Sequence, residues 1–190
     1  SFIIIALWLD LPDRKIEPSY IITYKNYSAK EKNICGICES IELIGKNKHR
    51  FFVAELETGY VILGDRQFFT GYTVFLCKKH VTELHLLEKN FREKYLKELC
   101  YVSEAVYNCF RPYKLNYEIL GNIYPHLHCH IFPRYPDDPG FKDPVWFKVS
   151  ELAKSDKHIP GEDELQFLKK SLLTELEKTK SIYIVNKFRF

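Results

Sequence analysis

The sequence of residues 126–131, His-Leu-His-Cys-His-Ile, carries the most information about this chain. Its three histidines stand at every second position, and a β-strand projects alternate side chains to one face, so all three imidazoles are expected to point the same way. The intervening apolar residues suit a buried opposite face. Pro125 and Pro133 flank the run and predict a short strand between them.

Three imidazoles on one face form a chemically versatile group. Imidazole titrates near neutral pH, and it serves as nucleophile, general base, general acid or metal ligand. Two plainer interpretations are a solvated histidine-rich strand and an accidental metal-binding tract.

A second motif favours a metal. Cys35 and Cys38 form a CxxC turn, which brings two sulfurs to the same side. CxxC is half of a zinc site, and the candidates for the other half are His80 and one histidine of the 126–130 strand. The competing interpretation is a redox pair, although no βαβ pattern surrounds the two cysteines.

Composition limits the function classes. A chain of 190 residues with 46% hydrophobic content predicts one core. The net charge of +3 suits small anionic ligands and predicts no nucleic-acid partner. Six cysteines without a secretory signal predict reduced thiols in the cytoplasm. The apolar run 2–9 is too short to span a membrane, so we expect an edge strand or a partner contact there.

The hydrophobic pattern predicts an α+β fold, namely an antiparallel sheet of about five strands with one long helix packed on it. The predicted strands are residues 51–55, 60–63, 72–77, 116–120 and 125–132. Apolar residues spaced by three and four predict the long helix within residues 83–110, ended by Arg111 and Pro112. A second helix is predicted at 162–180.

Four segments together resemble the histidine triad (HIT) family in order and spacing. They are the CxxC turn, residues 71–80, residues 116–122 and residues 126–134. The resemblance covers residues 35–147. Within the family, the chain is similar to zinc-containing bacterial HIT hydrolase-like proteins. It implies a HIT-like fold in one domain at 34–147, with an N-terminal extension at 1–33 and a C-terminal helical extension at 148–190.

The resemblance also implies site residues. The zinc ligands by position are Cys35, Cys38, His80 and His126. Four protein ligands leave no open position, so this zinc is expected to be structural. An alternative puts His80 in the core, with Cys77 or water completing the zinc site.

HIT enzymes use the middle histidine as a nucleophile, which makes His128 the expected catalytic residue, with His130 as a donor to the phosphoryl oxygens. Asn116 and Asn122 stand where the family contacts ribose and phosphate, and Asn122 replaces a more usual Gln. Asp65 is a candidate ribose ligand. Turn capping by the asparagines and a surface turn at Asp65 are the structural alternatives.

Less specific candidates accompany these residues. Phe68 or Phe69 is a candidate for stacking on the base, with a place in the core as the alternative. Arg134 either balances phosphate charge or is a solvated anchor.

Two function classes follow. The first is a hydrolase or transferase that cleaves at the α-phosphate of purine nucleotide conjugates, such as dinucleoside polyphosphates or nucleoside phosphoramidates, through a nucleotidyl-histidine. The second is a nucleotide-binding, zinc-stabilised interaction protein with little turnover. HIT proteins commonly pair as homodimers, and this chain has apolar runs at 2–9 and 182–185, so a homodimer is predicted.

Overall fold

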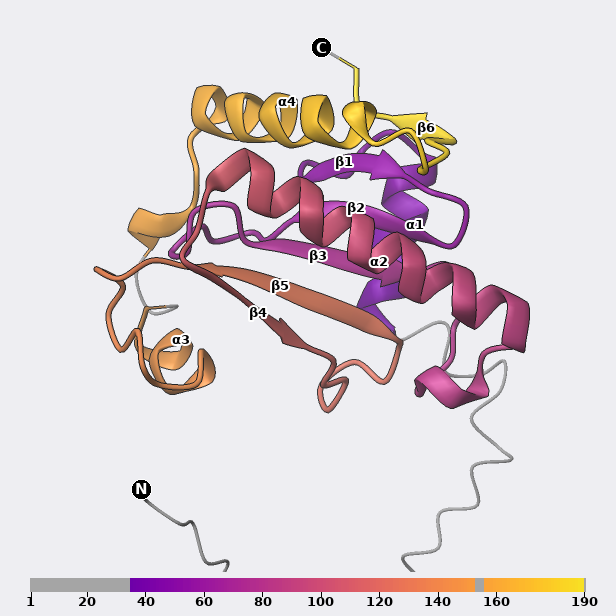
Figure 1. The fold of residues 1–190 in the computed structure, drawn as a ribbon, viewed down its shortest axis with the longest axis horizontal. Coiled ribbons are helices and arrows are strands. Elements are labelled where there is room, and N and C mark those ends of the chain that lie inside the picture. The colour runs from indigo at the N-terminus through magenta and orange to yellow at the C-terminus, as the bar shows by residue number, and fades with distance from the viewer. Residues whose placement is uncertain (1–34, 153–155, 190) are drawn as a thin grey trace, which may run out of the picture. The chain divides into compact units, whose positions relative to one another are not determined.

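A computed structural model describes residues 35–152 and 156–189 of the chain, and six of their strands form one antiparallel sheet (Figure 1). The strand order is β4-β5-β3-β2-β1-β6. The strands are β1 (Phe52–Glu55), β2 (Gly59–Leu63), β3 (Thr73–Cys77), β4 (Lys114–Glu118), β5 (His128–Arg134) and β6 (Asn186–Lys187). The α+β prediction is confirmed, and the short β6 adds a strand beside β1.

Two long helices pack on one face of this sheet, α2 (Lys89–Phe110) and α4 (Glu162–Lys178) (Figure 1). α4 contacts α2 and β1, and its apolar side is fully part of the core. The buried residues of that side include the predicted Leu165, Leu168, Leu172 and Leu176. The second predicted helix therefore completes the main core, together with Phe188 from the chain end.

The ends of α2 have local causes. Glu88 accepts hydrogen bonds from the backbone N–H groups of Asn90 and Phe91 and caps the first turn, so the helix begins six residues later than the earliest predicted position. A 3-10 turn, Leu84–Leu86, precedes it. At the other end Arg111 adopts a left-handed conformation and Pro112 follows, as predicted.

The opposite face of the sheet carries a second, smaller core. α1 (Gly36–Gly45) and α3 (Trp146–Leu152) lie on this side, and the segment after α3 includes a 3-10 turn, Asp156–His158. β3 is buried along its whole length because one core covers each face. Val74 and Leu76 face the smaller core, and Phe75 and Cys77 face the main core.

The prediction for the histidine strand was partly wrong in its bounds. β5 begins at His128 and not at Pro125, so His126 lies in the bend before the strand. β5 also continues through Pro133. The hydrogen-bond ladder between β3 and β5 ends where Thr73 faces Ile131. Pro133 lies beyond that point, so no carbonyl of β3 loses a hydrogen-bond donor because Pro133 has no N–H. β4 begins two residues earlier than predicted.

Two predictions about the chain ends are not settled by this fold. The interpretation of residues 2–9 lies outside the described residues, and the division at 33/34 and 147/148 stays a prediction. Across the described part of the chain, no helix combines the length and the apolar character that crossing a bilayer requires.

Candidate functional site

Four potential metal ligands converge from three places in the chain. Cys35 precedes α1 and Cys38 lies in its first turn, His80 follows β3, and His126 precedes β5. Their ligand atoms all lie within 4.8 Å of one another. The Cys38 sulfur lies 3.2 Å from His80 Nδ1 and 3.5 Å from His126 Nδ1. The structure thus brings together the four residues that the family resemblance names.

The spacing fits a tetrahedral zinc ion. Zinc bonds of about 2.3 Å to sulfur and about 2.0 Å to nitrogen give ligand-to-ligand distances of about 3.5 Å between S and N and about 3.3 Å between two N atoms. The Cys35 sulfur lies 3.6 Å from His126 Nδ1, and the two Nδ1 atoms of His80 and His126 lie 3.2 Å apart. The Nε2–H of His126 donates to the Cys77 carbonyl at 2.8 Å, which leaves Nδ1 unprotonated for a metal.

The other two histidines of the motif lie side by side on β5. His128 and His130 project from the same face of the strand, as the alternation predicts, and their Nε2 atoms are 3.0 Å apart. The Nδ1 atom of His128 lies 2.6 Å from the backbone carbonyl oxygen of His126. The residue that enters the metal cluster therefore also contacts the neighbouring imidazole through its backbone.

The hydrogen bonds leave one proton arrangement for the pair when both imidazoles are neutral. A carbonyl only accepts, so His128 Nδ1 carries the proton and its Nε2 keeps a lone pair. His130 Nε2–H then donates to that lone pair, and its Nδ1 accepts from the Tyr72 hydroxyl at 2.7 Å. The result is a series of hydrogen bonds that runs from the Tyr72 hydroxyl through His130 and His128 to the His126 carbonyl.

Burial favours these neutral forms. Desolvation lowers the pKa of His128, and desolvation followed by the neighbouring His128 lowers the pKa of His130 to about 4. Burial raises the pKa of Tyr72 far above its usual value, so its hydroxyl remains a donor. The sequence predicts Tyr72 only as part of a strand. The β3–β5 register places it beyond Thr73 on the face of His130, and that register is known only from the structure.

Two cavities meet at the histidine pair. The first, of about 350 Å³, lies between α1 and β2–β3 and includes Ile37, Ser40, Leu63 and Asp65 in its wall. The second, of about 390 Å³, lies between residues 120–124 and Trp146. His128 and His130 line both. A group held at the pair can extend into both cavities, as a phosphate with a substituent on each side would.

The structure separates the candidate substrate residues. Asp65 lines the first cavity with a side chain that is 66% exposed, next to Arg66 at 3.1 Å. Asn122 lines the second cavity. Asn116 shares the face of His130 on the neighbouring strand, but its side-chain oxygen accepts a hydrogen bond from Arg134. The substrate roles of all three remain predictions.

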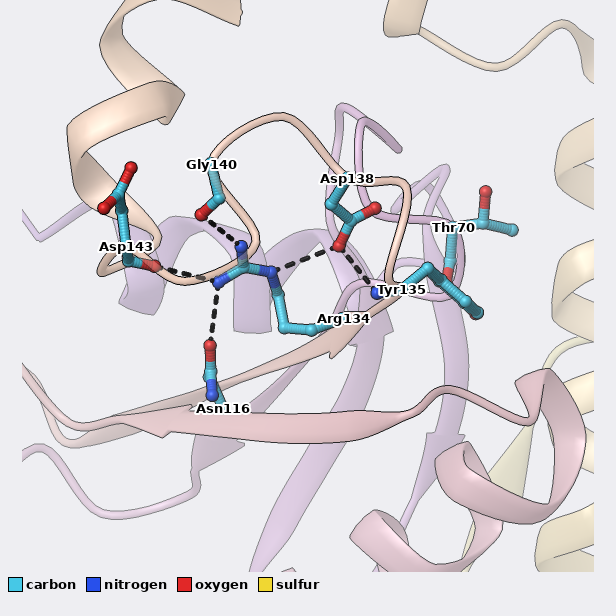
Figure 2. Close-up of polar contacts among 7 residues, drawn as sticks. All are labelled: Thr70, Asn116, Arg134, Tyr135, Asp138, Gly140 and Asp143. Atoms are coloured by element: carbon cyan, nitrogen blue, oxygen red, sulfur yellow. Dashed lines mark hydrogen bonds and ion pairs between the residues drawn. The ribbon is translucent and has the colours of Figure 1, made fainter.

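Arg134 is neither solvated nor available to a phosphate, which corrects both sequence interpretations of it. Its side chain is 2% exposed. It donates to the Asp138 carboxylate, to Asn116 and to the carbonyls of Gly140 and Asp143 (Figure 2). Asp138 also accepts from the backbone N–H of Tyr135. Arg134 thus fixes the loop that leads from β5 to α3.

The two phenylalanines proposed for base stacking do not reach the cavities. Phe69 is fully buried, so the core interpretation is confirmed for it. The Arg134 guanidinium carbon lies over its ring, 4.9 Å from the ring centroid. Phe68 packs edge-on against Phe69 and His158. The aromatic side chains that line the first cavity are instead Phe51, Tyr72 and Tyr124, together with three histidines.

Comparison with known proteins agrees with the fold and the motif. A model of the HIT domain matches residues 46–137, a range that begins after Cys35 and Cys38. A histidine triad protein from Marinobacter aquaeolei is 25% identical, with 67% of this chain and 88% of that chain covered and a TM-score of 0.59. No curated protein matches the chain.

Two further solved structures share the fold at lower identity. A hypothetical histidine triad nucleotide-binding protein from Sulfolobus tokodaii is 20% identical, with 75% of this chain and 94% of that chain covered and a TM-score of 0.58. A Zn-bound histidine triad family protein from Mycobacterium smegmatis is 18% identical, with coverages of 76% and 100% and a TM-score of 0.52. Residues 46–137 of this chain therefore match the HIT domain family.

Proposed function

We propose that this protein binds a purine nucleotide conjugate and cleaves it at the α-phosphate through a nucleotidyl-histidine on His128. One observation carries the proposal. His128 is held as a neutral imidazole with an unprotonated Nε2, at the junction of two cavities. That is the state in which imidazole attacks phosphorus. Nucleotide binding is supported by the match to the HIT domain and by the similarity to the hypothetical histidine triad nucleotide-binding protein from Sulfolobus tokodaii.

The first step forms a bond between His128 Nε2 and the α-phosphorus and breaks the bond from phosphorus to the leaving group. The imidazole gains positive charge in this step, and the hydrogen bond from its Nδ1–H to the His126 carbonyl stabilises that charge. His130 Nε2–H donates to the phosphoryl oxygens and stabilises the charge that builds on them, and the leaving atom takes its proton from solvent. Tyr72 holds His130 in the tautomer that this donation needs.

The second step returns the site to its starting state. Water attacks the phosphorus, the bond to His128 breaks, and the nucleoside monophosphate leaves with the water oxygen. The attacking water releases one proton to solvent, which balances the proton that the leaving group took up, and His130 keeps its Nε2–H throughout. The nucleoside is assigned to the first cavity, where the Asp65 carboxylate is available to accept ribose hydroxyls.

The metal cluster is assigned a structural zinc. Two thiolates and two imidazoles are ligands that zinc prefers, and four protein ligands close its tetrahedron. When bound, zinc supplies a cross-link among α1, the end of β3 and the start of β5, and His126 adds no chemistry of its own. The Zn-bound relative from Mycobacterium smegmatis supports this choice of metal. Both thiols must stay reduced to bind it, which agrees with the expected cytoplasmic location.

A homodimer remains part of the proposal, with a different surface from the one expected. Ile182 and Ile184 pack against the core, so the tail offers less apolar surface than its sequence suggests. Tyr117 in the edge strand β4 and Tyr113 just before it are instead exposed, beside neighbouring apolar groups next to α2. Two β4 edges can pair antiparallel about a two-fold axis. Light scattering at micromolar concentration should give twice the mass of one chain, and a monomer would contradict it.

The test of the function is hydrolysis of adenosine 5′-phosphoramidate and diadenosine tetraphosphate, followed as release of adenosine monophosphate. We expect turnover by the native protein and none above background by His128→Ala. Calorimetry of adenosine monophosphate with His128→Ala should show that binding is retained. Binding without turnover by the native protein would favour the alternative, a nucleotide-binding interaction protein.

A further inference from the structure

The second cavity differs from the first in the chemistry of its wall. Leu120, Ile123, Tyr124 and Trp146 provide its apolar surface, and they are 52%, 84%, 47% and 38% exposed. Large apolar side chains that gather at an exposed cavity mark a binding surface more often than side chains scattered singly. This cavity begins at the same two histidines that bound the proposed nucleoside cavity.

Charge around the second cavity disfavours a polyanion. Among the described residues that line it, none is Lys or Arg. The acid Glu118 lies opposite His130 in the β4–β5 register. A polyphosphate brings several negative charges that need cationic partners to offset their desolvation. An uncharged group needs none and gains from contact with the apolar wall.

The position of Trp146 is fixed by the surrounding structure. Its indole lies edge-on to two rings, with centroid distances of 5.5 Å to His130 and 5.7 Å to Phe132. The preceding residue, Val145, is 1% exposed in the smaller core. Arg134 donates hydrogen bonds to the carbonyls of Gly140 and Asp143, in the loop that leads to Trp146 (Figure 2). The wall of the cavity is therefore built into the fold before a ligand arrives.

We propose that this cavity, bounded by residues 120–124 and Trp146, binds the leaving group and selects apolar, uncharged leaving groups over polyphosphates. The inference rests on the proposed function, because a leaving group exists only if the α-phosphorus is attacked at His128. The preferred substrates are nucleoside 5′-phosphoramidates or phosphate esters whose amine or alcohol carries an aryl or alkyl group. The P–N or P–O bond breaks, and the amine or alcohol leaves with a proton taken from solvent.

The test compares three substrates that share adenosine and differ in the leaving group. They are adenosine 5′-phosphoramidate, its N-benzyl derivative and diadenosine tetraphosphate. We expect the native protein to give a kcat/KM for the benzyl compound at least about tenfold above the other two, the scale on which an apolar pocket discriminates. Equal values, or a preference for the tetraphosphate, would overturn the inference while leaving the proposed function intact.

Trp146→Ala should remove most of the benzyl preference, measured as the ratio of kcat/KM for the benzyl compound to that for the unsubstituted phosphoramidate, and thermal unfolding checks that the variant is folded. Trp146→Phe should retain part of the preference. The matched control is Phe147→Ala, because the adjacent Phe147 is 72% exposed and does not line the cavity. Equal loss with all substrates in Trp146→Ala would overturn the inference. Absence of turnover with any substrate in the native protein would contradict the proposed function itself.

Discussion

The backbone carbonyl oxygen of His126 lies 2.6 Å from Nδ1 of His128. His126 directs its side chain into the metal cluster and its carbonyl to the proposed nucleophile. The metal cluster is therefore connected to the reactive imidazole through one residue, although no metal ligand faces the reacting phosphorus in the proposed mechanism. This relationship predicts that loss of the metal and loss of the nucleophile have different consequences.

Loss of the metal should act through stability. Cys38→Ser removes one thiolate from a closed site, so the purified variant should lose zinc and melt at a lower temperature than the native protein. Zinc content by atomic emission and thermal unfolding check this. Cys100→Ser, at an exposed position on α2, is the matched control and should change neither. If Cys38→Ser is folded, metal-free and inactive at low temperature, the zinc is not merely structural.

Tyr72→Phe should slow turnover without affecting the fold. The substitution keeps the ring stacked on Phe132 at 4.2 Å and removes only the hydroxyl that donates to His130. A hydrogen bond of about 1 kcal/mol that orients the imidazole corresponds to a loss of about fivefold to tenfold in kcat. Steady-state kinetics and thermal unfolding separate the two effects. An unchanged kcat would mean that Tyr72 does not orient His130.

Arg134→Met should be strongly destabilising. The guanidinium and the Asp138 carboxylate are both nearly buried, so removing the cation leaves a buried charge and several carbonyls without their donor. We expect the free energy of unfolding to fall by about 3 kcal/mol or more, measured by urea titration. Lys46→Met breaks the exposed pair with Glu42 and should cost less than about 1 kcal/mol. Similar values for the two variants would show that the Arg134 network is not important for stability.

Glu98→Gln tests the connection between α2 and the β1–β2 turn. The buried Glu98 carboxylate accepts from the backbone N–H groups of Glu57 and Thr58 and from the Thr58 hydroxyl. Glutamine supplies one acceptor oxygen in place of two and turns an N–H₂ group toward the donors, so a loss of about 2 kcal/mol is expected. Glu93→Gln, at an exposed position of the same helix, is the control. No difference between the two by urea unfolding would contradict this account of the turn.

Local patterns in the sequence predicted most of the fold. The strand alternation at 128 and 130, the CxxC turn and the helical spacing in residues 83–110 all depend on neighbours in the chain, and each is present in the structure. The resemblance to HIT proteins supplied what spacing alone left open, namely which histidines join the cysteines. The bounds of β5 were wrong because a proline inside a strand is tolerated only where the partner strand ends, which sequence does not reveal.

The parts of the site that were missed depend on contacts between distant residues. Arg134 is buried because a loop folds back on it, and Trp146 reaches His130 through that loop. Tyr72 contacts His130 across a strand pair. A single sequence contains no signal for these contacts beyond the residue types themselves.

The most direct test of the central claim is identification of the covalent intermediate. The native protein is mixed briefly with adenosine 5′-phosphoramidate and denatured in base, where a phosphorus–nitrogen bond to histidine survives, and its peptides are analysed by mass spectrometry. We predict an adenylyl group on His128 that disappears as the substrate is consumed and that is absent from His128→Ala. Turnover without a label on His128, or with the label on His126 or His130, would contradict the account.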